Sequence, residues 1–323
     1  MTAHLMLGTD HLLHLSEDDV AGLLPPPLEA VRLAARALVS LADGSAELPP
    51  KPAVHPRADG FANAMPAYLR DADLLGLKWI AAYPANAALG LPTHTGLVVL
   101  SDAATGLPRA VMGAAALTGA RTAAVSGACI EALAPDLPGH VAITGAGVQA
   151  RTHLQMLEAL GRYDVVVVAR RPQSAADIEA WAAENAGDVS LTCAGSAQEA
   201  VDGAAIVVTA VPIGVAGATL DPGWLRDDAL VLPLDYATSV GAEIANPAAL
   251  FTDDVGQLLR YRDAGSFPGY RDPDDYCGNA IRAPRPAGRV VCQNLGNGAA
   301  DLLFADYVLR SALEAGSGTE LRR

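Results

Sequence analysis

Residues 141 to 171 constrain the fold more strongly than any other part of this chain. They begin with a short apolar run that ends in the pattern Gly-x-Gly-x-x-Ala, formed by Gly145, Gly147 and Ala150. A helical pattern follows, and a β-branched run lies over residues 164 to 168. Strand, glycine turn, helix and strand in this order are the context in which such glycines bind a dinucleotide.

Each small residue of the pattern has a physical role in such a site. Gly145 allows the tight turn, Gly147 lets the backbone approach a pyrophosphate, and Ala150 permits close packing of helix on strand. The N-terminus of the helix would face the phosphates. The alternative is a glycine turn in an ordinary α/β unit, and the flanking strands favour the cofactor site over it. The cofactor-binding residues predicted for this turn are Gly145, Ala146, Gly147, Val148 and Gln149.

The end of the second strand bears on which cofactor binds. An NAD enzyme usually has an acidic residue there, about 20 residues past the glycines, that holds the ribose hydroxyls. Arg170 and Arg171 occupy this place, and the next acid is Asp177. Two guanidiniums suit a 2′-phosphate because they bind it through forked hydrogen bonds, although they would equally be solvated charges on a loop. The sequence therefore favours NADP(H) over NAD(H).

Length and composition restrict the class of protein. The 323 residues suffice for two domains with a sizeable core. No apolar run reaches the ~18 residues of a membrane span, and the first residues lack the layout of a signal peptide. The net charge of −14 argues against nucleic acid or an anionic membrane as partner. We therefore expect a cytoplasmic protein with a small-molecule substrate.

The cysteines and histidines form no recognisable ligand motif. Cys129, Cys193, Cys277 and Cys292 are far apart in the chain, and the seven histidines include no i, i+4 pair. We therefore expect a reduced protein without a metal site or a redox pair of cysteines.

The first part of the chain combines short helices with β-like runs. Ser16 begins a helix as a capping hydroxyl followed by first-turn acids, and the prolines at 25 to 27 end it. The further elements expected are a helix over 28–41, β-like runs between 46 and 112 that include 74–82 and 95–100, and a helix over 118–133.

The middle of the chain alternates strands and helices. Later strands are expected over 189–192, 205–209 and 229–232, with crossover helices over 172–186 and 196–201. Alternation of this kind predicts a doubly wound parallel sheet. The pattern beyond Asp235 is irregular and rich in Gly and Pro over 265–286. A last helix is expected over 299–313, followed by a frayed tail from Gly316.

Three residues outside the glycine turn are candidates for chemistry. Asp235 follows a predicted strand and would lie at the carboxyl edge of the sheet, where ligands bind, or it caps a turn. Lys78 lies in an apolar run and, if buried rather than solvated at a sheet edge, could exchange protons near neutrality. Arg121 begins a small-residue helix and could hold a carboxylate or pair with a surface acid. Lysine occurs only at 51 and 78 among many arginines, which indicates a role that arginine cannot fill; the alternative is that the two lysines have no such role and persist by drift, since Lys51 lies in a Pro-rich segment.

Several motifs together resemble the ornithine cyclodeaminase/mu-crystallin family along nearly the whole chain. The matching segments, in the order and spacing of the family, are Ala64-Met65-Pro66-Ala67-Tyr68, Gly90-Leu91-Pro92, Asp102 with Thr105-Gly106-Leu107-Pro108, Leu117-Thr118-x-x-Arg121-Thr122-Ala123-Ala124, and Gly145 to Ala150. The resemblance implies an α/β protein with a Rossmann-type doubly wound parallel sheet and a separate α+β domain for substrate binding and dimerisation. The NAD(P)-binding Rossmann domain would span 121–299, and the substrate domain would combine 1–120 with 300–323. A homodimer is expected.

The resemblance also implies roles for single residues. Lys78 matches the lysine beside the reacting carbon and nitrogen, and Arg121 matches an arginine that holds the substrate carboxylate. Asp235 matches an aspartate that activates water or takes up the amine. Lys51 falls about where many members have a second carboxylate-binding arginine, and Arg57 competes with it for this role.

The remaining assignments concern the cofactor and the neighbours of Arg121. Arg170 lies where mu-crystallin-like members place a basic residue on NADPH. Thr122 is a further expected substrate-binding residue. Thr209, at the end of a predicted strand, is a further expected cofactor-binding residue.

The activity implied by the resemblance is that of an NAD(P)(H)-dependent oxidoreductase, with hydride transfer at the α-carbon of an amino acid or cyclic imino acid. One alternative is an ornithine cyclodeaminase, an ammonia-lyase that recycles its NAD, and another is a non-catalytic, crystallin-like NADPH-binding protein. The chain departs from the family at residues 297 to 301, where members often have two adjacent acids. Residues 236 to 239 also lack the Pro-Gly-Lys-like turn of ornithine cyclodeaminases, which argues against ornithine as the substrate.

Overall fold

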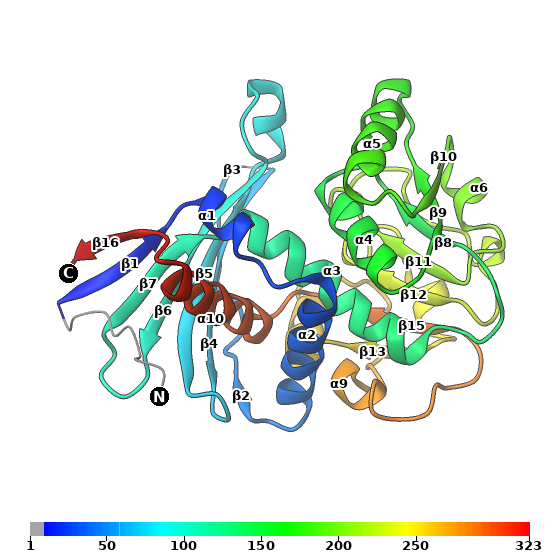
Figure 1. The fold of residues 1–323 in the computed structure, drawn as a ribbon. Helices are drawn as coiled ribbons and strands as arrows, with labels where there is room; N and C mark the ends of the chain where they lie inside the picture. Colours follow the sequence, from blue (N-terminus) through cyan, green and yellow to red (C-terminus); the bar gives the residue numbers. More distant parts are fainter. Residues whose placement is uncertain (1–9, 58) are drawn as a thin grey trace. The chain divides into compact units, whose positions relative to one another are not determined.

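The computed structural model describes residues 10–57 and 59–323 and divides into two compact units (Figure 1). Unit 1 combines Met1–Arg121 with Asn297–Arg323, and unit 2 is Thr122–Gly296. Each unit contains its own eight-stranded sheet. Among the described residues, no helix has both the length and the apolar character needed to cross a membrane.

The sheet of unit 1 is mainly an antiparallel meander. Its strand order is β16-β1-β7-β6-β5-β4-β2, with β3 paired to β4, and only the β1–β7 pair is parallel. The strands are β1 (His11–Leu15), β2 (Ala46–Glu47), β3 (Ala53–Arg57), β4 (Gly60–Leu69), β5 (Leu74–Ala82), β6 (His94–Asp102), β7 (Pro108–Gly113) and β16 (Thr319–Arg322).

The helices of unit 1 that pack on this sheet are α1 (Glu17–Gly22), α2 (Pro27–Ala42) and α10 (Gly298–Ala315). The 3-10 helix η1 (Pro84–Leu89) lies between β5 and β6 in the chain and has no buried residue. Helix α3 (Ala115–Leu133) runs from unit 1 into unit 2. The predicted helix start at Ser16 is confirmed, because its hydroxyl accepts a hydrogen bond from the Asp19 N–H. Helix α10 packs on β4, β5, β6 and α2.

Two glycines allow α10 to lie close to the sheet. A Cβ on Gly76 of β5 would approach the Leu302 side chain to 2.9 Å and the Val99 carbonyl to 2.3 Å. A Cβ on Gly298 would lie 3.0 Å from that of Ala67. The absence of side chains at these positions brings the first turns of α10 directly onto the middle of β5.

The prediction of a frayed tail from Gly316 is wrong. Gly316 and Gly318 adopt φ of 66° and 94°, which turn the chain back toward the sheet. Residues 319 to 322 then form β16, an antiparallel edge strand paired with β1. All four side chains of β16 are exposed, so the strand lacks the apolar alternation that would have revealed it.

The sheet of unit 2 is entirely parallel, in the order β10-β9-β8-β11-β12-β15-β13-β14. The chain order reverses between β8 and β11, so this is the switch point at which doubly wound sheets bind nucleotides. The strands are β8 (Val141–Thr144), β9 (Asp164–Val168), β10 (Ser190–Ala194), β11 (Ile206–Thr209), β12 (Leu230–Pro233), β13 (Ala249–Thr252), β14 (Asp275–Tyr276) and β15 (Val290–Gln293). The helices are α4 (Val148–Ala159), α5 (Pro172–Asn185), α6 (Ala197–Val201), η2 (Pro222–Trp224), α7 (Ala242–Ala245), α8 (Val255–Asp263) and α9 (Cys277–Ala280).

The chain beyond Asp235 is more regular than predicted. It contains α8 and the two four-residue strands β13 and β15, and β15 lies between β12 and β13 in the sheet. Every residue of β15 is buried. Three apolar residues followed by a buried glutamine carry no periodic signal, which explains why the sequence did not reveal this strand.

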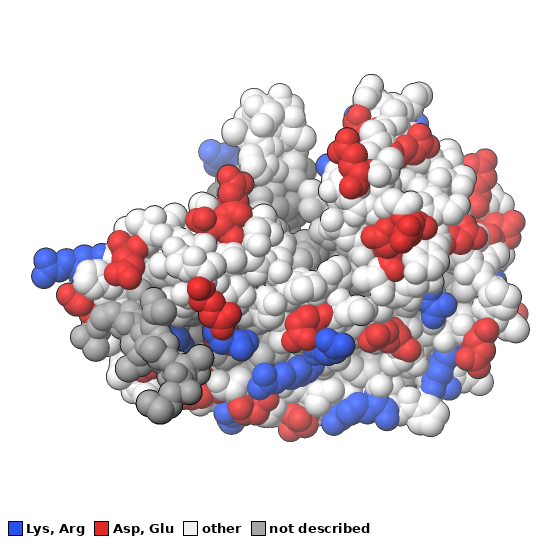
Figure 2. All heavy atoms as spheres, viewed as in Figure 1, with Lys and Arg blue, Asp and Glu red and all other residues white. Residues whose placement is uncertain are grey.

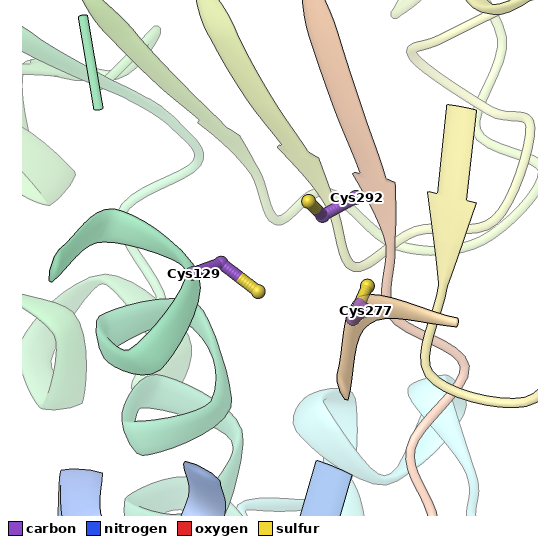
Figure 3. Close-up of side chains that lie close together, drawn as sticks. All are labelled: Cys129, Cys277 and Cys292. Atoms are coloured by element: carbon purple, nitrogen blue, oxygen red, sulfur yellow. The ribbon is translucent and has the colours of Figure 1, made fainter. Parts of the chain in front are cut away.

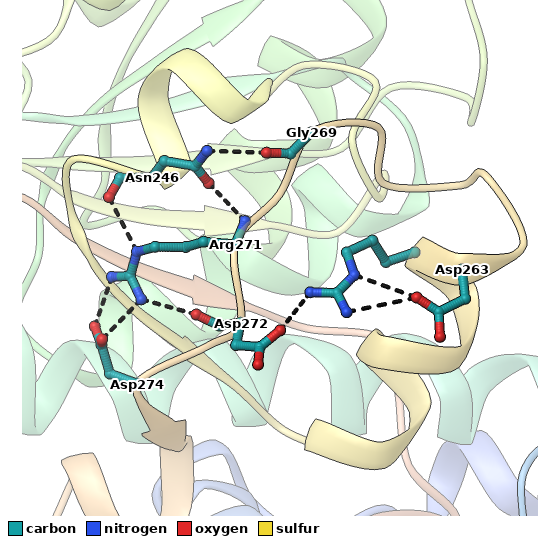
Figure 4. A network of polar contacts seen from close by, with 7 residues as sticks. Asn246, Asp263, Gly269, Arg271, Asp272 and Asp274 are labelled. Atoms are coloured by element: carbon teal, nitrogen blue, oxygen red, sulfur yellow. Dashed lines mark hydrogen bonds and ion pairs between the residues drawn. The ribbon is translucent and has the colours of Figure 1, made fainter.

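Arg271 orders the Gly- and Pro-rich segment of residues 265 to 286 (Figure 4). Its guanidinium donates to the carbonyls of Asn246 and Ala248 at 3.0 and 2.8 Å and forms an ion pair with Asp274 at 2.7 Å. Asn246 also donates to the Gly269 carbonyl at 2.9 Å. These bonds satisfy backbone carbonyls that no helix or sheet would otherwise pair.

Three of the four cysteines lie together in the fold although they are far apart in the chain. The Sγ atoms of Cys129, Cys277 and Cys292 lie within 4.8 Å of one another, and all three residues are buried (Figure 3). They come from α3, α9 and β15, which are adjacent in unit 2 although distant in sequence. Sequence spacing reports only local ligand motifs, so it could not reveal this cluster.

Charged side chains are mixed on the face of the molecule shown in Figure 2. Acidic residues are numerous there, as the net charge of −14 requires, and basic residues lie among them. This face therefore has no continuous basic patch of the kind that binds a polyanion.

Candidate active site

Lys78 lies at the centre of a buried ion cluster in unit 1. It stands on β5 between its register partners Met65 and Val98, and its side chain is fully buried on the face that α10 covers. Its Nζ donates to Asp301 Oδ1 at 2.7 Å and to Thr118 Oγ1 at 3.4 Å. In this buried position the ammonium group of Lys78 is hydrogen-bonded to one carboxylate and one hydroxyl instead of to water.

Asp301 binds a second cation through the same oxygen. The Nε of Arg121 lies 3.0 Å from Asp301 Oδ1, an ion-pair distance without the alignment of a hydrogen bond. The other oxygen, Oδ2, is buried and has no hydrogen-bond partner among the described residues. One carboxylate therefore faces two cations, and the cluster retains an excess positive charge that suits an anionic ligand.

The environment lowers the pKa of Lys78 to about 7. Burial is the largest cause, and the positive charge of Arg121 acts in the same direction. The ion pair with Asp301 opposes both effects but does not cancel them. Lys78 can therefore gain or lose a proton near neutral pH, as a general acid–base group requires.

The two candidates for a second carboxylate-binding residue have different surroundings. Lys51 is half-buried, and its charge contributes to the lowered pKa of Lys78. Arg57 is exposed on β3 and donates to the carbonyl of its neighbour Pro56 at 2.8 Å. Lys51 therefore acts electrostatically on Lys78. Thr122 follows Arg121 on α3 and is half-buried at the start of unit 2.

The glycine turn in unit 2 fits a dinucleotide. Gly145 has φ of 105°, and a Cβ there would lie 2.7 Å from the Ala210 carbonyl, so only glycine is tolerated. Gly147 caps α4 without a side-chain hydrogen bond, and a Cβ on it would meet nothing within 4 Å. Ala150 is fully buried against the sheet, while Val148 is exposed. The first N–H groups of α4 are thus open to a phosphate.

The other residues of the predicted cofactor set follow the strands at this edge of the sheet. Ala146 and Gln149 are half-buried in the turn and the first turn of α4. Arg170 and Arg171 are exposed directly after β9, and Arg171 is the N-cap residue of α5. Both guanidiniums are therefore accessible to a ligand at the carboxyl end of the parallel sheet.

Asp235 is almost fully buried after β12 and is held by several donors. The hydroxyls of Thr209 and Ser239 donate to its two oxygens at 2.8 and 2.7 Å, and the Val211 N–H lies at 3.4 Å. Burial raises the pKa of Asp235, although these hydrogen bonds act against the shift. Thr209 was predicted to bind the cofactor, but in the structure its buried hydroxyl holds Asp235.

A left-handed backbone follows this aspartate. Tyr236 has φ of 58°, an uncommon value for a residue with a large side chain. Its ring packs against those of Tyr261 and Phe267, with centroids 5.4 and 5.5 Å away. The aromatic packing stabilises a turn that fixes the position of Asp235.

The sequence reasoning did not identify Asp301 and Thr118 as site residues. Asp301 was noted only as part of a departure from the family pattern. The sequence nevertheless contains a signal for Asp301. This residue is a lone acid in the otherwise apolar segment 298–305, which is buried throughout. A carboxylate in such a place requires a cation, and Lys78 offers one from a similarly apolar strand.

Comparison with known proteins assigns the family. The family model described as "Ornithine cyclodeaminase/mu-crystallin family" matches residues 17–246. The chain belongs to this family. Ketimine reductase mu-crystallin of Mus musculus is 35% identical over 310 residues, which are 90% of this chain and 92% of the mouse protein.

Solved structures of similar proteins share the fold. A Thermococcus litoralis Δ1-pyrroline-2-carboxylate reductase in complex with NADH and L-proline has a TM-score of 0.83 and 24% identity, covering 95% of this chain and 99% of that one. An archaeal alanine dehydrogenase dimer with bound NAD also has a TM-score of 0.83 and 24% identity, covering 97% and 99%. The predicted α/β fold with a Rossmann-type parallel sheet is confirmed.

Replacing Asp301 tests whether its charge is needed to bury the two cations. Asp301→Asn keeps the shape but leaves Lys78 and Arg121 without their counter-ion, so we expect a loss of about 3–5 kcal/mol in the free energy of unfolding. Urea denaturation measures the loss. On the same helix, Asp306 pairs with the exposed Arg310 at 2.9 Å, and Asp306→Asn should cost less than about 1 kcal/mol. Equal, small losses in both variants would show that the buried ion pair does not contribute to stability.

Proposed function

We propose that this protein is an NAD(P)(H)-dependent oxidoreductase acting at the α-carbon and nitrogen of an amino acid or cyclic imino acid. The observation that carries the proposal is the buried Lys78, which has a pKa of about 7 and lies beside Arg121 and Asp301. The names of similar proteins support it, since they include a ketimine reductase and a Δ1-pyrroline-2-carboxylate reductase.

The cations of unit 1 would hold the substrate carboxylate. The Nε of Arg121 lies 3.0 Å from Asp301 Oδ1, and the forked end of a guanidinium can bind a carboxylate through two parallel hydrogen bonds. Lys51 would add a second positive charge. Fixing the carboxylate at two points would set the α-carbon and its nitrogen in one orientation, and such positioning lowers the barrier of the reaction.

Lys78 would move the proton that accompanies the reaction. In the direction of imine reduction its ammonium would donate a proton to the substrate nitrogen, and in the direction of oxidation the neutral amine would accept one. Asp301 would retain the negative charge that makes either form of Lys78 tolerable in a buried site.

The glycine turn of unit 2 would hold the cofactor. Residues 145 to 149 and the N-terminus of α4 would bind the pyrophosphate, and Arg170 with Arg171 would bind a 2′-phosphate. When bound, the nicotinamide supplies or accepts the hydride.

A true cyclodeaminase is a second candidate, favoured by Asp235. This carboxyl is buried with a raised pKa and is held in place by Thr209 and Ser239, as expected for a group that transfers a proton to or from water or a departing amine. A cyclodeaminase would release ammonia without net use of cofactor, whereas a reductase consumes NADPH in proportion to product.

A panel of substrates tests the proposed function. Cyclic imino acids, α-keto acids with amines, and ornithine or lysine would be assayed by cofactor absorbance together with ammonia release. Consumption of NADPH with a cyclic imino acid is the expected result. Ammonia release with no net change in cofactor would identify the cyclodeaminase, and no turnover of any member would contradict both.

Substitution of Lys78 tests its role in proton transfer. Lys78→Arg keeps a positive charge but cannot lose its proton in the accessible pH range, so turnover should fall by about 10²–10⁴-fold while the folded protein still binds NADPH. Lys78→Met should fall by a similar factor. The measurement is the turnover number with cofactor saturating, and a value for Lys78→Arg within a few-fold of wild type would show that only the charge matters.

The pH dependence gives an independent check of the same role. Because the pKa of Lys78 is about 7, its protonated form is lost as the pH rises through that value. The kcat/KM for imine reduction should therefore fall above neutral pH, and that for amino acid oxidation should rise. A structural lysine would leave both profiles unchanged in that pH range.

The preference for NADPH is tested at Arg170. Arg170→Ala removes a charged contact to the 2′-phosphate, which typically contributes ~1.5–3 kcal/mol, so the affinity for NADPH should fall about tenfold or more while that for NADH changes little. Arg162→Ala is a matched control, because this exposed arginine precedes β9 whereas Arg170 follows it. Titration of each variant with both cofactors gives the result, and equal weakening of both would reject the assignment.

We also propose a homodimer formed through the sheet of unit 1. Trp79 on β5 and Leu97 on β6 are register partners and point away from the face that α10 covers, with 44% and 46% of their surfaces exposed. Adjacent large apolar side chains on an exposed sheet are typical of a subunit interface. Support also comes from the archaeal alanine dehydrogenase, which is described as a dimer.

Light scattering of variants tests the homodimer. Trp79→Glu should convert the dimer into a monomer, because it places a charge in the apolar interface. Leu321→Glu, on the exposed edge strand β16, should leave the mass unchanged. A monomer at all concentrations of the wild-type protein would exclude the proposal.

A further inference from the structure

Three buried cysteines form a sulfur cluster that neither the glycine turn nor the Lys78 site uses. Cys129, Cys277 and Cys292 have their Sγ atoms within 4.8 Å of one another, and Figure 3 shows the three side chains directed toward a common point. All three are free thiols, and none has measurable exposure. The fourth cysteine, Cys193 on β10, is only half-buried and is not part of this cluster.

The cluster is held by three regular elements of unit 2. Cys129 lies on the long helix α3 beside the buried Ile130, Cys277 is the first residue of α9, and Cys292 pairs in register with Phe251 within the parallel sheet. Ligands carried by helices and strands are held more precisely than ligands on loops. The sulfurs are therefore arranged before any ion binds.

The three thiols interact with one another. Hydrogen bonds from Cys277 and Cys292 lower the pKa of the Cys129 thiol. Burial is the main cause that raises the pKa of Cys277, and the hydrogen bond with Cys129 is the main cause that raises that of Cys292. The three thiols are therefore close enough to interact directly, and the negative charge of the buried Asp253 acts against the lowered pKa of Cys129.

Sulfur ligands and their number restrict the kind of ion. Mg²⁺ and Ca²⁺ require oxygen ligands, whereas thiolates select soft ions such as Cu(I) and Zn²⁺. Structural zinc sites have four protein ligands. In the described part of the chain no fourth Cys, His, Asp or Glu joins the group. A soft ion that accepts three sulfur ligands fits this set better than an ion that requires four.

We propose that Cys129, Cys277 and Cys292 bind one monovalent soft metal ion, Cu(I), in a three-sulfur site inside unit 2. The ion would bind to the three sulfurs in place of thiol protons, and each thiol that becomes a thiolate releases one proton to the solvent. No electron transfer is involved.

Anaerobic titration with Cu(I) in the presence of a chromogenic Cu(I) chelator tests the site. Wild-type protein should take about one chelator-resistant Cu(I) per chain and show ultraviolet absorption from sulfur-to-copper charge transfer. The variants Cys129→Ala, Cys277→Ala and Cys292→Ala should each lose both signals. Cys193→Ala, in the same unit, should retain them.

Labelling of thiols keeps the proposal testable even where an alanine variant does not fold. Wild-type protein, with and without Cu(I), would be partly unfolded, treated with an alkylating reagent and examined by mass spectrometry. Cu(I) should protect Cys129, Cys277 and Cys292 and leave Cys193 labelled. Uniform labelling of all four cysteines, no chelator-resistant copper, or tighter binding of Zn²⁺ than of Cu(I) would each overturn the proposal.

Discussion

The buried ion pair between Lys78 and Asp301 is the interaction on which the candidate site depends. It joins the centre of β5 to the first turn of α10, 223 residues later in the chain. Burying two ions is costly unless they are paired at close range, so the pair forms only if the helix lies tightly on the sheet. Gly76 and Gly298 permit that approach, and packing and electrostatics therefore act on the same few positions.

The two units differ in the groups that they place at their candidate sites. In unit 1 Asp301 faces both Lys78 and Arg121, and burial together with the charge of Arg121 lowers the pKa of Lys78. Unit 2 contributes an open helix N-terminus after a turn in which only glycine fits at position 145. The proposed function would therefore use positive side chains of unit 1 for a carboxylate and backbone N–H groups of unit 2 for phosphates.

The sequence predicted those features whose signals are local. The glycine turn, the alternation of unit 2 and the apolar run around Lys78 are all visible within windows of about 10 to 30 residues. The partners that complete the site are separated by much longer stretches of chain, and no periodicity connects Lys78 with Asp301 or Cys129 with Cys292. The edge strand β16 and the buried strand β15 were missed for a related reason, since neither alternates between apolar and polar residues.

Unit 1 draws its chain from both ends of the sequence, with unit 2 inserted between them. During synthesis the residues of unit 2 leave the ribosome before α10 exists, so unit 2 has all of its chain available while β5 still exposes the face that α10 will cover. At this stage Lys78 lacks its counter-ion Asp301, so its side chain is solvated rather than buried. The last 27 residues, 297 to 323, must close a loop across an entire folded unit, which makes docking of α10 a late, entropically costly step in the biogenesis of this protein.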